Sequence, residues 1–65
     1  MAWYVLCTRD RYCEVHSQDL SQNPAHGYRR LAGPLNAEDD AQAWKFKNCR
    51  RHQPDPNHPP DWLCP

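Results

Sequence analysis

The stretch AWYVLCTRDRYCEVHS, residues 2–17, decides the fold of this chain. Residues 2–8 and 12–17 are rich in aromatic and β-branched side chains, which favour β-strands. The polar triplet at 9–11 separates these two runs and suits a three-residue hairpin loop. The stretch therefore predicts an antiparallel β-hairpin.

With Asp10 at the centre of the loop, the register of the hairpin follows directly. The residues expected to face each other are Trp3 and Ser17, Val5 and Val15, and Cys7 and Cys13. These residues share one face because side chains alternate along a strand. The other face is expected to be the wetter one, and it carries Tyr4, Leu6, Thr8, Tyr12, Glu14 and His16.

Turn and helix signals divide the rest of the chain. Residues 18–27 are rich in Ser, Gln and Asn and are broken by a proline and a glycine, which predicts a loop. A short third strand is expected at 28–32, ended by the dipeptide at 33–34. A helix is expected from about 37 to 51 with Asn36 as its N-cap. Carboxylates cluster in its first turn and cations in its second half, the order that the helix dipole favours.

The expected helix carries an apolar stripe that should lie on the sheet, formed by Ala37, Ala41 and Trp44 and broadened by Ala43 and Phe46. Residues 53–65 contain five prolines and cannot continue the helix. Because Trp62 would be costly to leave in water, this tail is expected to fold back and dock there. The predicted fold class is α+β: a ββ-loop-βα domain over residues 1–52 and an extended proline-rich tail at 53–65.

The junction between the third strand and the helix resembles a known sequence. Residues 31–41 read LAGPLNAEDDA, which is similar to the Gly-Pro, acidic, Ala junction between a strand and a helix in peptidoglycan-binding sporulation-related repeats. The similarity covers eleven residues, has Leu35 where those repeats carry an aromatic residue, and lacks their second βα half. It implies a strand-to-helix junction here and no function.

Length and composition limit the fold and the function. Only eight of the 65 residues are Leu, Val or Phe, and none is Ile. A core alone rarely supplies more than about 3–5 kcal/mol at this size, so the aromatic and cysteine residues should carry much of the packing. A Rossmann fold, a barrel and a membrane span need longer chains or longer apolar runs. The apolar start has no basic segment and breaks at Thr8, so we expect a cytoplasmic protein without a signal peptide.

Zinc is the only cofactor that the residues suggest. Cys49 and His52 are three positions apart at the end of the expected helix, close enough to share one tetrahedral zinc ion. One ligand set is local and its spacing resembles a zinc knuckle: Cys49, His52, His58 and Cys64. The other joins hairpin to helix and resembles a ββα zinc finger: Cys7, Cys13, Cys49 and His52.

Two other states of the four cysteines remain open at this point. In a reducing compartment the cysteines can be free thiols that pack as small hydrophobic side chains. In an oxidising compartment they can form disulfides, with three possible connectivities.

Catalysis is not expected. The two glycines of the chain cannot build a phosphate-binding loop. The neighbouring Asp39 and Asp40 point about 100° apart on a helix and cannot share a proton. Cys49 and His52 could form a nucleophile pair, but so small a chain offers little wall to exclude water from a substrate.

Binding functions remain. We expect a non-enzymatic interaction or regulatory module whose partner is another protein or a second copy of the chain. Zinc bound by one of the two ligand sets would stabilise this module. The edge strand at 28–32 and the tail that carries Trp62 are the features such a partner would cover. The alternative is a small nucleic-acid-binding protein that uses the basic helix end, Lys45, Lys47, Arg50 and Arg51. The net charge of zero gives no long-range attraction to nucleic acid or to a membrane, and no membrane partner is expected.

Overall fold

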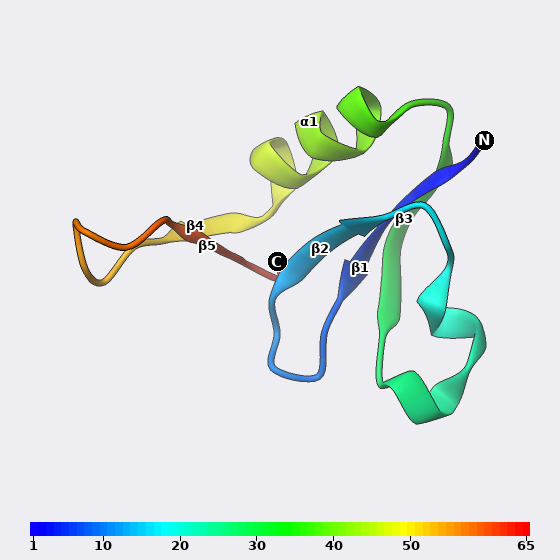
Figure 1. Ribbon diagram of the computed structural model, residues 1–65, viewed down its shortest axis with the longest axis horizontal. Helices are drawn as coiled ribbons and strands as arrows, with labels where there is room; N and C mark the ends of the chain where they lie inside the picture. The colour runs from blue at the N-terminus through cyan, green and yellow to red at the C-terminus, as the bar shows by residue number, and fades with distance from the viewer.

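The computed structural model describes residues 1–65 and contains two small β-sheets and one α-helix (Figure 1). Its strands are β1 (Trp3–Cys7), β2 (Cys13–His16), β3 (Arg29–Leu35), β4 (Arg50–His52) and β5 (Asp61–Leu63). Two 3-10 turns, η1 (Leu20–Gln22) and η2 (Pro24–His26), precede β3, and the helix α1 (Glu38–Asn48) follows it. The predicted α+β class is confirmed, and the second sheet is an addition to it.

The first sheet is antiparallel and has β1 at its centre, in the order β2-β1-β3. The predicted hairpin register is confirmed, because Val5 pairs with Val15 and Cys7 pairs with Cys13. Helix α1 packs against all three strands of this sheet. The hairpin therefore forms the framework on which the other elements are placed.

The hairpin loop has the three-residue form that the polar triplet predicts. The Thr8 amide donates to the Tyr12 carbonyl at 2.9 Å, and the Arg11 amide donates to the Thr8 carbonyl at 3.0 Å. Arg11 has a φ of 74°, in the left-handed region. The last residue of such loops takes this conformation, which is usually left to glycine.

The expectation that Leu6 lies on a wet face is wrong, because its side chain is completely buried. Leu6 has Glu14 opposite it in β2 and Arg30 opposite it in β3. Arg30 forms an ion pair with Asp19 at 3.1 Å, and Glu14 accepts a hydrogen bond from Tyr28. These two contacts therefore hold the segment between β2 and β3 to the residues that lie opposite Leu6.

Strand β3 continues through Gly33 and Pro34, where the strand was expected to end. Proline has no backbone N–H group to donate to a neighbouring strand. It is tolerated in β3 because β3 is an edge strand and has no neighbouring strand on its outer side. The register against β1 is irregular between Trp3 and Val5. Gly33 has a φ of 115°, and a Cβ atom on it would lie 2.7 Å from the carbonyl oxygen of Trp3. Only glycine permits this close approach of the two backbones.

Helix α1 is shorter than the predicted range of 37–51. Ala37 is its N-cap and makes no side-chain capping hydrogen bond, so the assignment of Asn36 as N-cap is wrong. The helix ends at Asn48 because Cys49 is extended, with a φ of −86° and a ψ of 154°, and is bonded to the hairpin. The charge order along the helix is as predicted, with three acidic residues in the first turn and two lysines in the last.

The predicted apolar stripe of α1 is only partly buried. Ala41 is completely buried, and Trp44 packs against the cysteine residues of the core. The side chains of Ala37, Ala43 and Phe46 are exposed instead. One turn of the helix therefore contacts the core closely, and Phe46 stands at its border.

The residues after α1 form a two-stranded antiparallel ribbon, β4-β5, where an extended tail was expected. The predicted docking of Trp62 is confirmed, because its side chain packs against the buried cysteines. Strand β5 also joins the hairpin, through a bridge between Tyr12 and Leu63 and a hydrogen bond from the Cys64 amide to the Arg11 carbonyl at 2.9 Å. The far end of the ribbon projects away from the first sheet (Figure 1).

Candidate functional site

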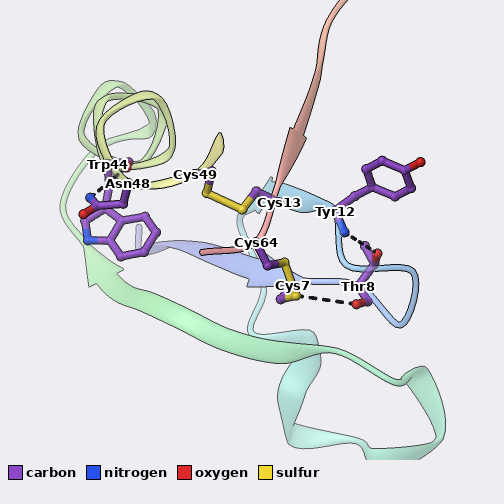
Figure 2. The surroundings of a disulfide bond; sticks show 8 residues. All are labelled: Cys7, Thr8, Tyr12, Cys13, Trp44, Asn48, Cys49 and Cys64. Carbon is purple, nitrogen blue, oxygen red and sulfur yellow. Dashed lines mark hydrogen bonds between the residues drawn. A yellow bond between two sulfur atoms is a disulfide. The ribbon is translucent and has the colours of Figure 1, made fainter. Parts of the chain in front are cut away.

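Two disulfide bonds occupy all four cysteines: Cys7–Cys64 and Cys13–Cys49 (Figure 2). Their Cα atoms are 6.0 and 6.6 Å apart. The four cysteines form one buried cluster, and three partly buried side chains pack against it: Leu31, Trp44 and Trp62. Sulfur atoms and indole rings therefore fill much of the core, a position that aliphatic side chains occupy in larger domains.

The disulfides overturn both predicted zinc sites. Zinc binds cysteine as thiolate, and a sulfur in a disulfide is no longer available in that form. Both ligand sets depended on cysteines: Cys49, His52, His58 and Cys64 in one, and Cys7, Cys13, Cys49 and His52 in the other. His52 and His58 are exposed, and no group of three or more His, Cys, Asp or Glu side chains is placed to hold a metal ion. Of the three states that the sequence leaves open, the disulfide is the one present.

An aromatic pair joins the end of α1 to β5. The ring centroids of Phe46 and Trp62 are 4.9 Å apart, with an angle of 57° between the ring planes. The Lys45 ammonium nitrogen lies 5.4 Å from the centre of the Phe46 ring, within the range of a cation–π contact. Phe46 is 54% exposed. The pair therefore presents a large apolar ring to solvent with a cation beside it.

The four cations of the nucleic-acid alternative do not gather in one patch. Arg51 lies directly opposite Trp62 in the β4-β5 ribbon, so both side chains are on the same face of the ribbon. Arg50 is on the other face because successive side chains alternate. Lys47 is two positions beyond Lys45, which on a helix places the two side chains on different sides. Only Lys45 and Arg51 therefore accompany the aromatic pair.

A shallow groove lies beside this pair, between the hairpin and β5. It is termed here the aromatic groove, and it is lined by Tyr12, Cys13, Glu14, Lys45, Pro60, Asp61 and Trp62. The Tyr12 side chain points outward from the loop end of the hairpin, away from the disulfides (Figure 2). Trp62 therefore lines the groove together with Tyr12 and also contacts the Phe46 ring.

The charges in the groove differ in how firmly they are held. Glu14 Oε1 lies 2.8 Å from His16 Nε2 and accepts a hydrogen bond from the Tyr28 hydroxyl at 3.2 Å. Burial, and next the charge of Glu14, raise the pKa of Tyr28 above its usual value of 10.0, so this phenol remains a donor. Asp61 and Lys45 form no ion pair. The groove thus has one fixed carboxylate, one free carboxylate and one free ammonium group.

Sequence reasoning identified only part of this surface. It placed Lys45 and Arg51 among candidate binding residues and expected Trp62 to dock. It assigned Phe46 to the buried stripe, and it placed Tyr12 on the wetter strand face without expecting it to lie beside Trp62. The missing information is the position of β5 beside the hairpin, which depends on a disulfide between residues 57 positions apart.

Comparison of the chain with protein-family models, with curated proteins and with solved structures finds no match in any of the three. No helix of the protein has both the length and the apolar character needed to cross a membrane. The role of the aromatic groove must therefore follow from its own chemistry.

Proposed function

We propose that the protein is a non-enzymatic binding module that recognises another protein through the aromatic groove and the adjoining Phe46 ring. The observation that carries the proposal is that Trp62 lines the groove with Tyr12 and contacts the exposed Phe46 ring. Tyr12 is 39% exposed and Phe46 54% exposed in a chain that buries only seven residues. Tyrosine, tryptophan and arginine are enriched among the residues that dominate the binding energy of protein interfaces.

The charges of the groove favour a protein partner over a nucleic acid. Lys45 and Arg51 beside aromatic rings suit phosphates and bases. Glu14 and Asp61 lie within the same groove region, however, and they repel phosphates. A protein surface can present groups of both signs to a groove that carries both signs. The nucleic-acid alternative is therefore the weaker proposal.

Pre-organisation by the disulfides supports a binding role. Phe46 lies three residues before Cys49, and Trp62 lies two residues before Cys64. Each ring is therefore tethered to the hairpin through a nearby covalent bond. A surface that is already ordered loses less conformational entropy when a partner binds.

We also propose that the protein works in an oxidising compartment, in place of the cytoplasmic setting expected from the sequence. Disulfides form and persist in secreted or periplasmic proteins and are rare in the cytosol. Two disulfides in so short a chain are typical of small extracellular domains, which lack a large hydrophobic core.

Selection from a displayed library of random peptides tests the proposed binding surface. The bait is the oxidised protein, and selected peptides are then titrated against Tyr12→Ala, Phe46→Ala and the matched control Ala43→Gln, which changes an exposed position on the same helix. We expect the first two variants to weaken binding by at least about tenfold, as for central interface residues, and the control to bind like the wild type. Selected peptides that bind all three variants equally well, or no enriched peptide at all, would contradict the proposal.

A further inference from the structure

Strand β4 has a free edge. Its partner β5 is occupied on both sides, by β4 on one and by the hairpin at Tyr12 and Arg11 on the other. Strand β4 pairs with β5 alone, and its three residues are all exposed. Backbone donors and acceptors on its outer side are therefore open to another strand.

Positive charge lies on both faces of this edge. Strand β4 consists of Arg50, Arg51 and His52. Arg51 is on the face that carries Trp62, and its two neighbours are on the opposite face. The two ion pairs of the protein involve none of these residues. An incoming strand would therefore meet unpaired cations above and below the plane of the ribbon.

These charges discriminate among possible occupants. A second copy that paired through its own β4 would bring arginines against arginines, and like charges opposite each other destabilise a strand pair. A nucleic acid would use the arginine side chains but leave the backbone edge unpaired, and Asp61, directly opposite His52, would repel its phosphates. An extended peptide with carboxylates on both faces satisfies both the backbone and the side chains.

We propose that β4 accepts an extended acidic segment of a partner protein as a third strand of the β4-β5 ribbon. The inference rests on the proposed function, because it names the kind of segment that the same partner contributes. A carboxylate opposite Arg51 lies on the Trp62 side of the extended ribbon, next to the aromatic groove. The segment and the groove therefore form one contiguous binding surface.

Titration of the oxidised, ¹⁵N-labelled protein with short synthetic peptides tests this inference by NMR. The probe has consecutive glutamates flanked by valine and threonine, and the matched peptide has lysines in place of the glutamates. A third peptide carries N-methyl groups on alternate backbone amides of the acidic sequence, which prevent strand pairing. A single-stranded oligothymidine of similar length serves as the nucleic-acid probe.

We expect the acidic peptide to bind with chemical-shift changes centred on residues 50–52 and to slow hydrogen exchange of their outward amides. The variant Arg51→Glu should weaken binding of the acidic peptide by roughly tenfold and should strengthen binding of the lysine peptide. It replaces a positive charge at the edge of β4 by a negative one. Equal binding of acidic and lysine peptides, undiminished binding of the N-methylated peptide, or a preference for oligothymidine at these residues would overturn the inference.

Its failure can be told apart from failure of the proposed function. If the selected library peptides require Phe46 but the acidic peptide causes no chemical-shift change in β4, only this inference is overturned. If the acidic peptide adds a strand to β4 but the library peptides bind equally well without Phe46 or Tyr12, the inference is supported and the proposed role of the groove is overturned.

Discussion

Cys7 and Cys13 lie directly opposite each other across β1 and β2, yet each is bonded to a distant cysteine and not to the other. Cys7 holds the C-terminal segment through Cys64, and Cys13 holds the end of α1 through Cys49. One hairpin therefore anchors both elements that carry the aromatic pair of Phe46 and Trp62. Stability and the candidate binding surface depend on the same two bonds.

Removing either disulfide should destabilise the protein strongly. The Cys7–Cys64 bond joins residues 57 positions apart and the Cys13–Cys49 bond joins residues 36 apart. Loop-closure entropy for such lengths corresponds to about 4 kcal/mol for each bond. The double variants Cys7→Ala/Cys64→Ala and Cys13→Ala/Cys49→Ala should each lose most of the free energy of unfolding in urea denaturation. A loss below about 1 kcal/mol in either variant would show that the bond is not a principal support.

Leu6 should behave as a core residue although it lies on the face that alternation marks as polar. Truncation of a completely buried leucine typically costs about 2–5 kcal/mol. We expect Leu6→Ala to lower the free energy of unfolding within this range, and the exposed-site control Lys47→Ala to change it by less than about 0.5 kcal/mol. Similar small effects of both substitutions would contradict the burial of Leu6.

The hairpin loop offers a stabilising substitution. Arg11 occupies the left-handed region with a φ of 74°, which costs a side chain with a Cβ atom about 1 kcal/mol. Arg11→Gly should therefore raise the thermal midpoint. Asp10→Gly is the matched control and should lower the midpoint or leave it unchanged, because Asp10 has no positive φ to relieve. Stabilisation by the control but not by Arg11→Gly would argue against the loop conformation.

Acid should weaken the contacts that hold the segment between β2 and β3. The hydrogen bond from the Ser21 hydroxyl, more than any other contact, lowers the pKa of Asp19 below its usual value of 3.8. A carboxyl group with a lowered pKa in the folded state stabilises that state above the unfolded pKa, and the contribution is lost as pH falls through the folded value. The thermal midpoint of the wild type should therefore fall below about pH 4.

The variant Asp19→Asn isolates this contribution. It should be less stable than the wild type at neutral pH, and the difference between the two midpoints should shrink as the pH is lowered from about 5 to 2. A difference that stays constant over this interval would mean that the Asp19 charge does not support the fold.

The hairpin and its register could be predicted from the sequence because they depend on local rules. Alternation and the polar triplet at 9–11 are sufficient to pair Cys7 with Cys13, and the order of charges indicates a helix in the region of α1 but does not define its ends. Burial of Leu6 could not be predicted in this way, since its face also carries the long-range contacts of Asp19 with Arg30 and of Tyr28 with Glu14. The alternation of side chains predicts which residues of a strand pair share a face, but it does not predict which other segments of the chain lie against that face.

The disulfides and the second sheet depend on long-range geometry. Four cysteines permit three pairings, and no local pattern distinguishes them. The prolines after residue 53 predict an irregular segment, so β5 is not apparent from the sequence. Its three residues form a strand because β4 and Tyr12 lie beside them. The groove was therefore beyond local reasoning, although Lys45, Arg51 and Trp62 were each identified separately.

Mapping the disulfides of the unreduced protein tests the central claim most directly. Trypsin cleaves after Lys and Arg, which occur between every pair of successive cysteines. Mass spectrometry of a digest prepared at about pH 6.5, where disulfide exchange is slow because few thiols are ionised, should show the Cys7 peptide linked to the Cys64 peptide and the Cys13 peptide linked to the Cys49 peptide. Free thiols, or a link between the Cys7 and Cys13 peptides, would contradict the account of how one hairpin holds the aromatic surface.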